Sequence, residues 1–351
     1  MGRRVLSVRR VLLACGALLA LGLAAAAGLW LYAGRWQRAP LAGLTHVVVV
    51  EIAPGEPLGR VAEELAARGL MDHPRLFTWL ARREGKASRV QAGEYALAPG
   101  TSPLALLEQL VEGRVLLHPV TLVEGWTAAA ALESLHANAL LKRSVPAIGD
   151  PQLMARLGSP GVAAEGQFFP DTYLVPKGAS DFEVLRLAHG RLEDRLATAW
   201  LRRRADLPLA SAYEALILAS IIEKETGDPE ERPHIAAVFV NRLRRGMRLQ
   251  TDPTVIYGLG AAYDGSIHRR DLTSDTPYNT YTRDGLPPTP IALASGAALE
   301  AAVQPAESED LYFVATGRGD GRHEFSRTLE AHNAAVARYL ERLRGGGGGR
   351  R

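Results

Sequence analysis

ILASIIEKET, residues 217–226, is the stretch that most constrains the fold. Its unbroken apolar run ends in a carboxylate, Glu223, and good helix formers flank it. A helix that is apolar all round is normally buried, so the run predicts a core helix with Glu223 at the edge of an apolar interior. Desolvation raises the pKa of a carboxyl, which suits a general acid near neutral pH. The alternative is that Glu223 merely begins the solvated end of a core helix.

The N-terminus predicts a membrane anchor. Residues 11–33 form an uncharged run of 23 residues, and such a helix crosses a hydrocarbon layer of about 30 Å. Arginines at 3, 4, 9 and 10 precede the run, whereas those at 35 and 38 follow it. The positive-inside bias therefore predicts a cytoplasmic tail over residues 1–10 and an outside location after residue 33. A cleaved signal peptide is the alternative, although its apolar core is typically about 7–15 residues.

Charge and cysteine content exclude several classes of protein. The pI is near 9.1, but nine arginines lie at the two ends, leaving 32 basic against 38 acidic residues in between. The folded part therefore carries a net charge of about −6 and lacks the basic surface of a nucleic-acid binder. The single cysteine, Cys15, lies inside the apolar run, so no intramolecular disulfide is possible.

The region after the anchor divides into two expected domains of an α+β chain. After a tether over residues 34–44, a strand (45–52), two helices (58–68 and 72–80) and a strand (93–97) predict a small β-α-α-β domain over residues 45–118. A helix over 102–112, capped by Ser102, completes it. Residues 119–343 predict a larger mixed α/β domain with helices at 127–139, 181–201, 210–226, 233–245 and 328–343 and strands or loops at 311–315 and 321–325. The glycine-rich tail, residues 344–351, is expected to be disordered.

The residue types present leave carboxylate chemistry, with no metal and no cofactor. The histidines at 234, 268, 323 and 332 are scattered, with no i, i+4 pair and no cysteine partner, which argues against zinc. The sequence has no Gly-x-Ser-x-Gly elbow and no phosphate loop. None of its four lysines stands in a setting that indicates a Schiff base.

Several segments combine glycine, proline, amides and aromatic residues, a mixture typical of sugar binding. Each also has a purely structural interpretation. Asp252-Pro253 is a good helix start, Pro170-Asp171 a plain turn, and Asn241 a possible cap of a neighbouring loop. In chain order the motifs are VEGWT (123–127), EGQFFPDTY (165–173), LASIIEKET (218–226), VFVNRL (238–243), MRLQTDPTVIYG (247–258), YNTY (278–281) and GLPP (285–288).

Together these motifs resemble the endolytic murein transglycosylases, the MltG or YceG-like family, over roughly residues 47–340. The resemblance implies a LysM-like first domain and peptidoglycan glycan strands as the substrate. It also implies Glu223 as the single catalytic acid/base, a single-pass anchor in the cell (inner) membrane and a periplasmic or otherwise extracytoplasmic catalytic domain. Peptidoglycan synthases or division proteins are implied as partners. Residues that would bind sugar or stabilise the developing positive charge are Asn241, Gln250, Thr251, Tyr278, Asn279 and Tyr281.

Two features of the site depend on its tertiary surroundings. Glu225 stands two residues from Glu223, and such neighbours point to different sides of a helix, so we expect Glu225 to be solvated. After GLPP the family continues with glycine and, later, proline, whereas Thr289 and Ala294 stand here. The rival functions are a glycan-binding division scaffold without catalysis, a soluble cofactor lyase and a two-carboxylate muramidase.

Overall fold

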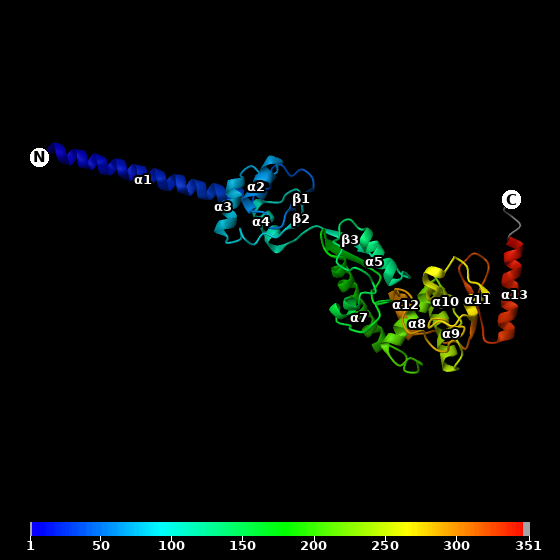
Figure 1. Ribbon diagram of the computed structural model, residues 1–351. Helices are drawn as coiled ribbons and strands as arrows, with labels where there is room; N and C mark the ends of the chain where they lie inside the picture. The colour runs from blue at the N-terminus through cyan, green and yellow to red at the C-terminus, as the bar shows by residue number, and fades with distance from the viewer. Residues whose placement is uncertain (1, 347–351) are drawn as a thin grey trace. The chain divides into compact units, whose positions relative to one another are not determined.

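The computed structural model describes residues 2–346 and divides the chain into two compact units, Met1–His118 and Pro119–Arg351. Figure 1 shows the order of their helices and strands. Each unit has its own hydrophobic core.

The first unit joins a long helix to a small domain. Its elements are α1 (Gly2–Trp36), β1 (Val48–Ile52), α2 (Leu58–Ala67), α3 (Pro74–Arg83), β2 (Gly93–Leu97) and α4 (Pro103–Glu112). The strands pair antiparallel, with Val48 opposite Leu97 and Ile52 opposite Gly93. The β-α-α-β order expected from the sequence is confirmed, and so is the cap by Ser102, whose side chain accepts from the Ala105 N–H.

Helix α1 extends beyond the expected apolar run at both ends. Residues 10–36 are long and apolar enough to cross a membrane, and the most apolar part of this helix has no buried residue, whereas Ala33 near its end is buried. The segment that follows is not a free tether, since Leu41 and Leu44 are buried in the core of the first unit. The backbone carbonyl of Gln37 also accepts a hydrogen bond from the Leu104 N–H at 3.0 Å, which ties the end of α1 to α4.

The second unit is mainly helical, with two small two-stranded sheets, β3–β4 and β5–β6. Its elements are β3 (Leu117–Thr121), which begins at the unit boundary, α5 (Ala128–Ala137), α6 (Pro151–Arg156), β4 (Thr172–Pro176), α7 (Asp181–Leu201), α8 (Ala212–Glu225), α9 (Arg232–Arg244), α10 (Asp252–Leu259), the 3-10 turn η1 (Gly260–Ala262), α11 (Arg269–Thr273), α12 (Gly296–Val303), β5 (Tyr312–Ala315), β6 (His323–Ser326) and α13 (Leu329–Gly346).

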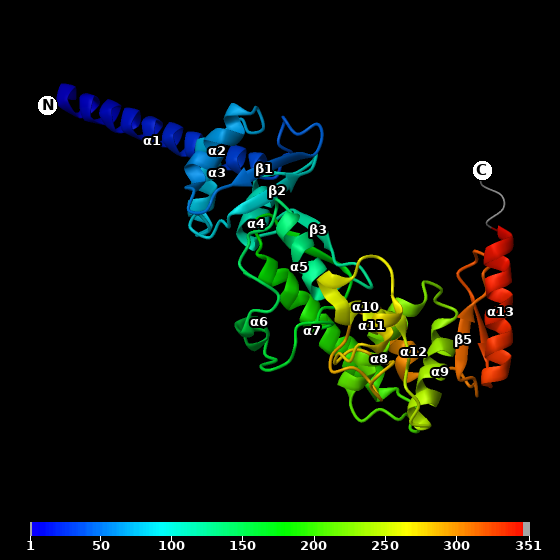
Figure 2. The ribbon, with the colours of Figure 1, turned by 45° about the vertical axis from the view of Figure 1, so that its right-hand side comes forward.

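Helix α8 is the centre of the second unit. Ser211 caps it, and every residue from Ala215 to Ile222 is buried, as the apolar run predicts. Helices α7, α9, α10 and α12 pack around it, while α13 lies along β5 (Figure 2). A second core in this unit gathers around the fully buried Phe168.

The five long helices expected in the second unit are confirmed with small shifts of their ends. The short elements α6, α11, α12 and the β3–β4 pair were not expected, because five to eight residues are too few to show a clear period. A helix does start at Asp252. Residues 344–346 of the expected disordered tail continue α13, and residues 347–351 lie outside the described chain.

Candidate functional site

The C-terminal turn of α8 carries both candidate carboxylates. Thr226 leaves the helix in an extended conformation (φ −143°, ψ 138°), and Gly227 and Pro229 prevent its continuation. Because residues two apart on a helix point in different directions, Glu223 and Glu225 reach different surroundings.

Glu223 joins three helices. Its Oε1 accepts from Arg232 Nη2 at 3.1 Å, and its Oε2 accepts from the Ser295 N–H at 3.0 Å. Ser295 is the N-cap of α12, and Arg232 is the first residue of α9. The side chains of Glu223 and Arg232 are 5% and 8% exposed. Both carboxyl oxygens are therefore engaged in holding α8, α9 and α12 together.

Glu225 faces a cavity of about 400 Å³ instead. The other lining residues are Arg242, Leu249, Gln250, Thr251, Asp252, Tyr281, Tyr312, Phe313, Val314, Leu329, His332 and Val336. The expectation that Glu225 is solvated is wrong, because residues 249–252 and the β5–α13 region cover this side of the helix end. Tertiary packing of segments distant in sequence, which helical spacing does not report, leaves Glu225 half-buried.

The surroundings of Glu225 favour its protonated form. Burial raises the pKa of Glu225 to about 7, and the nearby Asp252 charge also raises it. The hydroxyl of Thr251, which donates to Glu225 Oε1, opposes this rise, as do His323 and Arg242. A carboxyl with a pKa near neutrality can both give and take a proton at physiological pH.

The loop that brings Thr251 to Glu225 has an unusual backbone. Gln250 has φ +50°, and no other described residue except glycine has a positive φ. The N–H groups of Gln250 and Thr251 donate to the carbonyl and the hydroxyl of Thr280, at 3.2 and 3.1 Å. Left-handed backbone at a residue other than glycine is uncommon and is often found at functional sites.

Arg242 supports the same loop from α9. Its Nη1 donates to the Leu249 carbonyl at 2.9 Å, and its Nε donates to the Leu311 carbonyl at 2.7 Å. The guanidinium carbon lies 5.1 Å from the ring centre of Tyr312. Arg242 belongs to the VFVNRL motif but was not among the residues predicted to form the site. Arg242 precedes an apolar residue on a helix that is buried in the fold, and this position could have marked it as a candidate site residue.

Tyr281 and Asp252 form the polar wall of the cavity. The Tyr281 hydroxyl donates to Asp252 Oδ1 at 2.6 Å. Burial and the hydrogen bond to Asp252 raise the pKa of Tyr281, so the phenol keeps its proton and remains a donor. Of the residues expected to bind sugar, the structure thus brings Gln250, Thr251 and Tyr281 together with Glu225.

The other three expected sugar-binding residues lie elsewhere. Asn241 donates to the carbonyls of Ser308 and Asp310, at 2.8 and 3.1 Å, and lines a separate cavity of about 320 Å³. Asn279 is buried, and its amide donates to the backbone carbonyls of residues 271, 272 and 274. These amides organise loops.

Tyr278 contacts Thr289, one of the two residues that depart from the family pattern. Its hydroxyl and Thr289 Oγ1 are 2.9 Å apart, and its ring lies edge-on to Tyr257 at 4.8 Å. Thr289 also donates to the Pro290 carbonyl at 2.8 Å. The threonine thus ties the loop after GLPP to Tyr278, while Ala294 is simply buried.

Among the described residues, no group of three or more histidine, cysteine or acidic side chains could hold a metal ion.

The comparisons of this chain with known proteins agree with one another. Residues 50–338 match the model of the YceG-like family. The chain is 30% identical over 310 residues to a Bacillus subtilis protein named endolytic murein transglycosylase, covering 84% of this chain and 85% of that protein. It is 27% identical to the Streptococcus pneumoniae protein of that name, covering 84% of this chain and 58% of the relative. A crystal structure of a yceG-like protein from Listeria monocytogenes is similar with a TM-score of 0.51 and 29% identity, covering 82% of this chain and 99% of that chain.

Proposed function

The chain belongs to the YceG-like family, and we propose that it is an endolytic murein transglycosylase that cuts peptidoglycan glycan strands internally. The observation that carries the proposed chemistry is Glu225, a carboxyl with a pKa of about 7 on the wall of a 400 Å³ cavity. A cavity with a few convergent polar groups and a perturbed pKa is the usual form of an active site.

In the proposed mechanism Glu225 acts first as an acid and then as a base. The protonated carboxyl gives its proton to the glycosidic oxygen as the bond from that oxygen to the anomeric carbon of N-acetylmuramic acid breaks. The carboxylate then accepts the proton of the 6-hydroxyl of the same sugar, whose oxygen bonds to the anomeric carbon. The products are a free hydroxyl and a 1,6-anhydro ring, and no water is consumed. Because the nucleophile is intramolecular, one carboxyl is enough.

Two contrasts favour Glu225 over Glu223, the residue that the family resemblance implies. Glu223 has both oxygens bonded within the protein, to Arg232 and to the Ser295 N–H. Glu225 lines the cavity and accepts a described hydrogen bond from one group, the Thr251 hydroxyl. A general acid must reach the substrate oxygen, so the carboxyl on the cavity wall is the better candidate.

The neighbouring residues have supporting roles in this proposal. The Tyr281 oxygen is placed to accept from a sugar hydroxyl, because its proton is held by Asp252, and Gln250 is placed to donate to one. Arg242 positions the loop that carries Thr251. Asp252 lines the same cavity as Glu225, which is the observation in favour of the muramidase alternative. In that reaction Asp252 would act as nucleophile or activate a water molecule.

The setting is proposed on the same basis. Helix α1 spans the inner membrane once, with residues 1–10 in the cytoplasm and the remainder on the periplasmic side, in accord with the arginine distribution. The small domain of the first unit is LysM-like, as its β1-α2-α3-β2 order suggests. Peptidoglycan synthases or division proteins are the proposed partners.

The products of a peptidoglycan digest test this proposal. The full chain in detergent, as wild type, Glu225→Gln and Glu223→Gln, is incubated with purified peptidoglycan, and the fragments are weighed by mass spectrometry. We expect 1,6-anhydromuramic ends from wild type and from the folded fraction of Glu223→Gln, and none from Glu225→Gln. Reducing ends that disappear in Asp252→Asn would establish the muramidase. Tight glycan binding without new ends, beside an active relative in the same assay, would establish the scaffold.

A further inference from the structure

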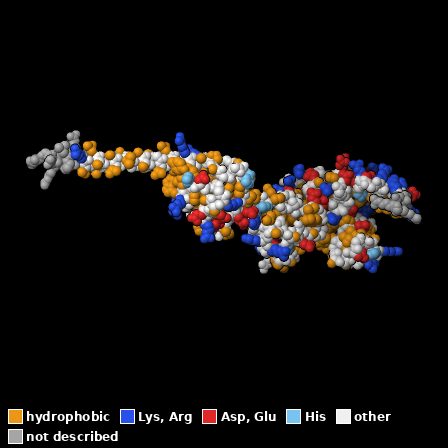
Figure 3. Space-filling view, turned by 90° about the horizontal axis from the view of Figure 1, so that it is seen from above, with side chains coloured by type: hydrophobic (Ala, Val, Ile, Leu, Met, Phe, Trp, Pro, Cys, Tyr) orange, Lys and Arg blue, Asp and Glu red, His pale blue; other side chains and the backbone are white. Residues whose placement is uncertain are grey.

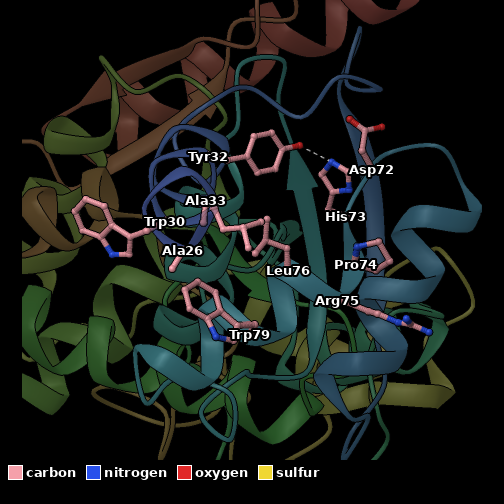
Figure 4. Close-up of a pocket in the computed structure, with 11 residues that line it drawn as sticks. Ala26, Trp30, Tyr32, Ala33, Asp72, His73, Pro74, Arg75, Leu76 and Trp79 are labelled. Carbon is pink, nitrogen blue, oxygen red and sulfur yellow. Dashed lines mark hydrogen bonds between the residues drawn. The ribbon is translucent and has the colours of Figure 1, made fainter. Parts of the chain in front are cut away.

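A groove of about 740 Å³ lies between the end of α1 and the start of α3, within the first unit (Figure 4). Leu29 and Trp30 line it from α1, and Leu76 and Trp79 line it from α3. Trp30 is 68% exposed and Trp79 is 44% exposed. Two large indoles open to the surroundings in one groove indicate a binding surface, because contiguous exposed apolar patches mark contacts with partners or membranes.

The position of the groove along α1 indicates which partner covers it. This inference rests on the proposed membrane anchor. A helix rises 1.5 Å per residue, so about 20 residues counted from Val11 cross a hydrocarbon layer of about 30 Å and end near Trp30. Ala26 and Leu29 then lie just inside the outer edge of the hydrocarbon, and Tyr32 lies at the level of the headgroups. Trp and Tyr are enriched at this depth.

The residues at the rim of the groove are polar, as expected for side chains at the level of the lipid headgroups. Tyr32 Oη and His73 Nε2 are 2.7 Å apart and join α1 to the residue before α3. Asp72 and the exposed Arg75 complete the polar edge. Beyond it, the guanidinium of Arg83 lies 5.2 Å from the ring centre of Trp79. Arginines beside an apolar groove complement a ligand with an apolar tail and an anionic head.

The apolar surface is also continuous with the membrane helix. Figure 3 shows hydrophobic side chains along α1 and on the adjoining face of the first unit. On this face a bilayer that surrounds α1 therefore reaches hydrophobic side chains of the first unit.

We propose that a phospholipid of the outer face of the membrane occupies this groove. Its acyl chain lies against Leu29, Trp30, Leu76 and Trp79, and its phosphate lies near Arg75. The bound lipid holds α3 against the bilayer, so the small domain rests on the membrane surface.

Fluorescence quenching in vesicles tests this proposal. The full chain with Cys15→Ser and Trp79→Cys is labelled at position 79 with the environment-sensitive fluorophore NBD. It is reconstituted in vesicles of phosphatidylethanolamine and phosphatidylglycerol, with and without bromine on the acyl chains. The matched control carries the label through Val49→Cys, since Val49 is 45% exposed on β1 and does not line the groove. We expect brominated lipid to quench most of the emission at position 79 and to leave that at position 49 unchanged.

A second substitution separates the groove from general contact with the membrane. Leu76→Glu places a charge in the groove, so in the chain labelled at position 79 it is expected to abolish quenching while circular dichroism stays unchanged. Persistent quenching in Leu76→Glu would overturn the proposal, since the label would then touch lipid outside the groove.

Three other results would also overturn the proposal. Emission at position 79 that iodide quenches and brominated lipid does not would mean an empty groove. Blue-shifted emission that neither agent quenches would mean that protein covers the groove, either a second copy or another membrane protein. Flotation of the chain with the vesicles serves as a control for the proposed membrane anchor. A chain that does not float would overturn the anchor itself, and this failure is thereby distinguished from failure of the groove proposal.

Discussion

Glu225→Gln and Glu223→Gln are expected to change stability in opposite directions, although they make the same chemical change two residues apart. The pKa of Glu225 is raised from 4.5 to about 7 in the folded chain. Between these values the folded state holds the proton more tightly than the unfolded state, so the free energy of unfolding falls as the pH rises through this window. The difference corresponds to about 3 kcal/mol above pH 7. Glutamine carries no charge to desolvate, so Glu225→Gln is expected to stabilise the chain by up to that amount at pH 8, and little at pH 4.

Glu223→Gln removes the partner of a buried cation. The side chains of Glu223 and Arg232 are 5% and 8% exposed, and Arg232 Nε has no hydrogen-bond partner in the described structure. Breaking a buried ion pair by removing one partner typically costs about 3–5 kcal/mol, because the remaining charge is left uncompensated. We therefore expect Glu223→Gln to destabilise the second unit at pH 8.

Urea unfolding of the full chain, followed by circular dichroism at pH 5 and pH 8, measures both changes. The same samples are assayed for 1,6-anhydromuramic ends, so stability and cleavage are compared in one preparation. We expect Glu225→Gln to be more stable and inactive, and Glu223→Gln to be less stable with activity in its folded fraction. A destabilised Glu225→Gln at pH 8, or a stable Glu223→Gln without cleavage, would refute the reasoning and return the catalytic role to Glu223.

Four further outcomes are expected. Wild-type cleavage should fall above about pH 7, because proton donation needs protonated Glu225, and a pH–rate profile measures this falling limb. At pH 7 half of the Glu225 carboxyls are protonated, against about 0.3% for an ordinary carboxyl. Thr251→Val should move this limb to higher pH, since the hydroxyl lowers the pKa. Asp252→Asn should move it to lower pH and still give anhydro ends; loss of all cleavage would contradict a single-carboxyl mechanism. Phe168→Ala should lower the free energy of unfolding by about 3–5 kcal/mol without moving the limb, because Phe168 is buried in a separate core; a shifted limb would contradict this separation.

Periodicity was sufficient for the long elements of this chain. The helix over residues 181–201 has the bounds expected from its pattern, and the buried run of α8 is the one read from its apolar residues. Long helices with a clear hydrophobic pattern report their own burial. The sequence pattern of short elements such as α11 and α12 did not report their burial, because their formation depends on neighbours supplied by the rest of the fold.

The motifs predicted a site at the end of α8, with Glu223 as the carboxyl of raised pKa. In the fold, tertiary packing raises the pKa of Glu225 to about 7. Arg232 and the start of α12 engage Glu223, whereas the loop at 249–252 and strand β5 enclose Glu225. Helical spacing shows that the two side chains diverge, but burial and charge depend on segments that folding brings from up to about a hundred residues away. A pKa is set by those surroundings, so local sequence could not distinguish the two glutamates.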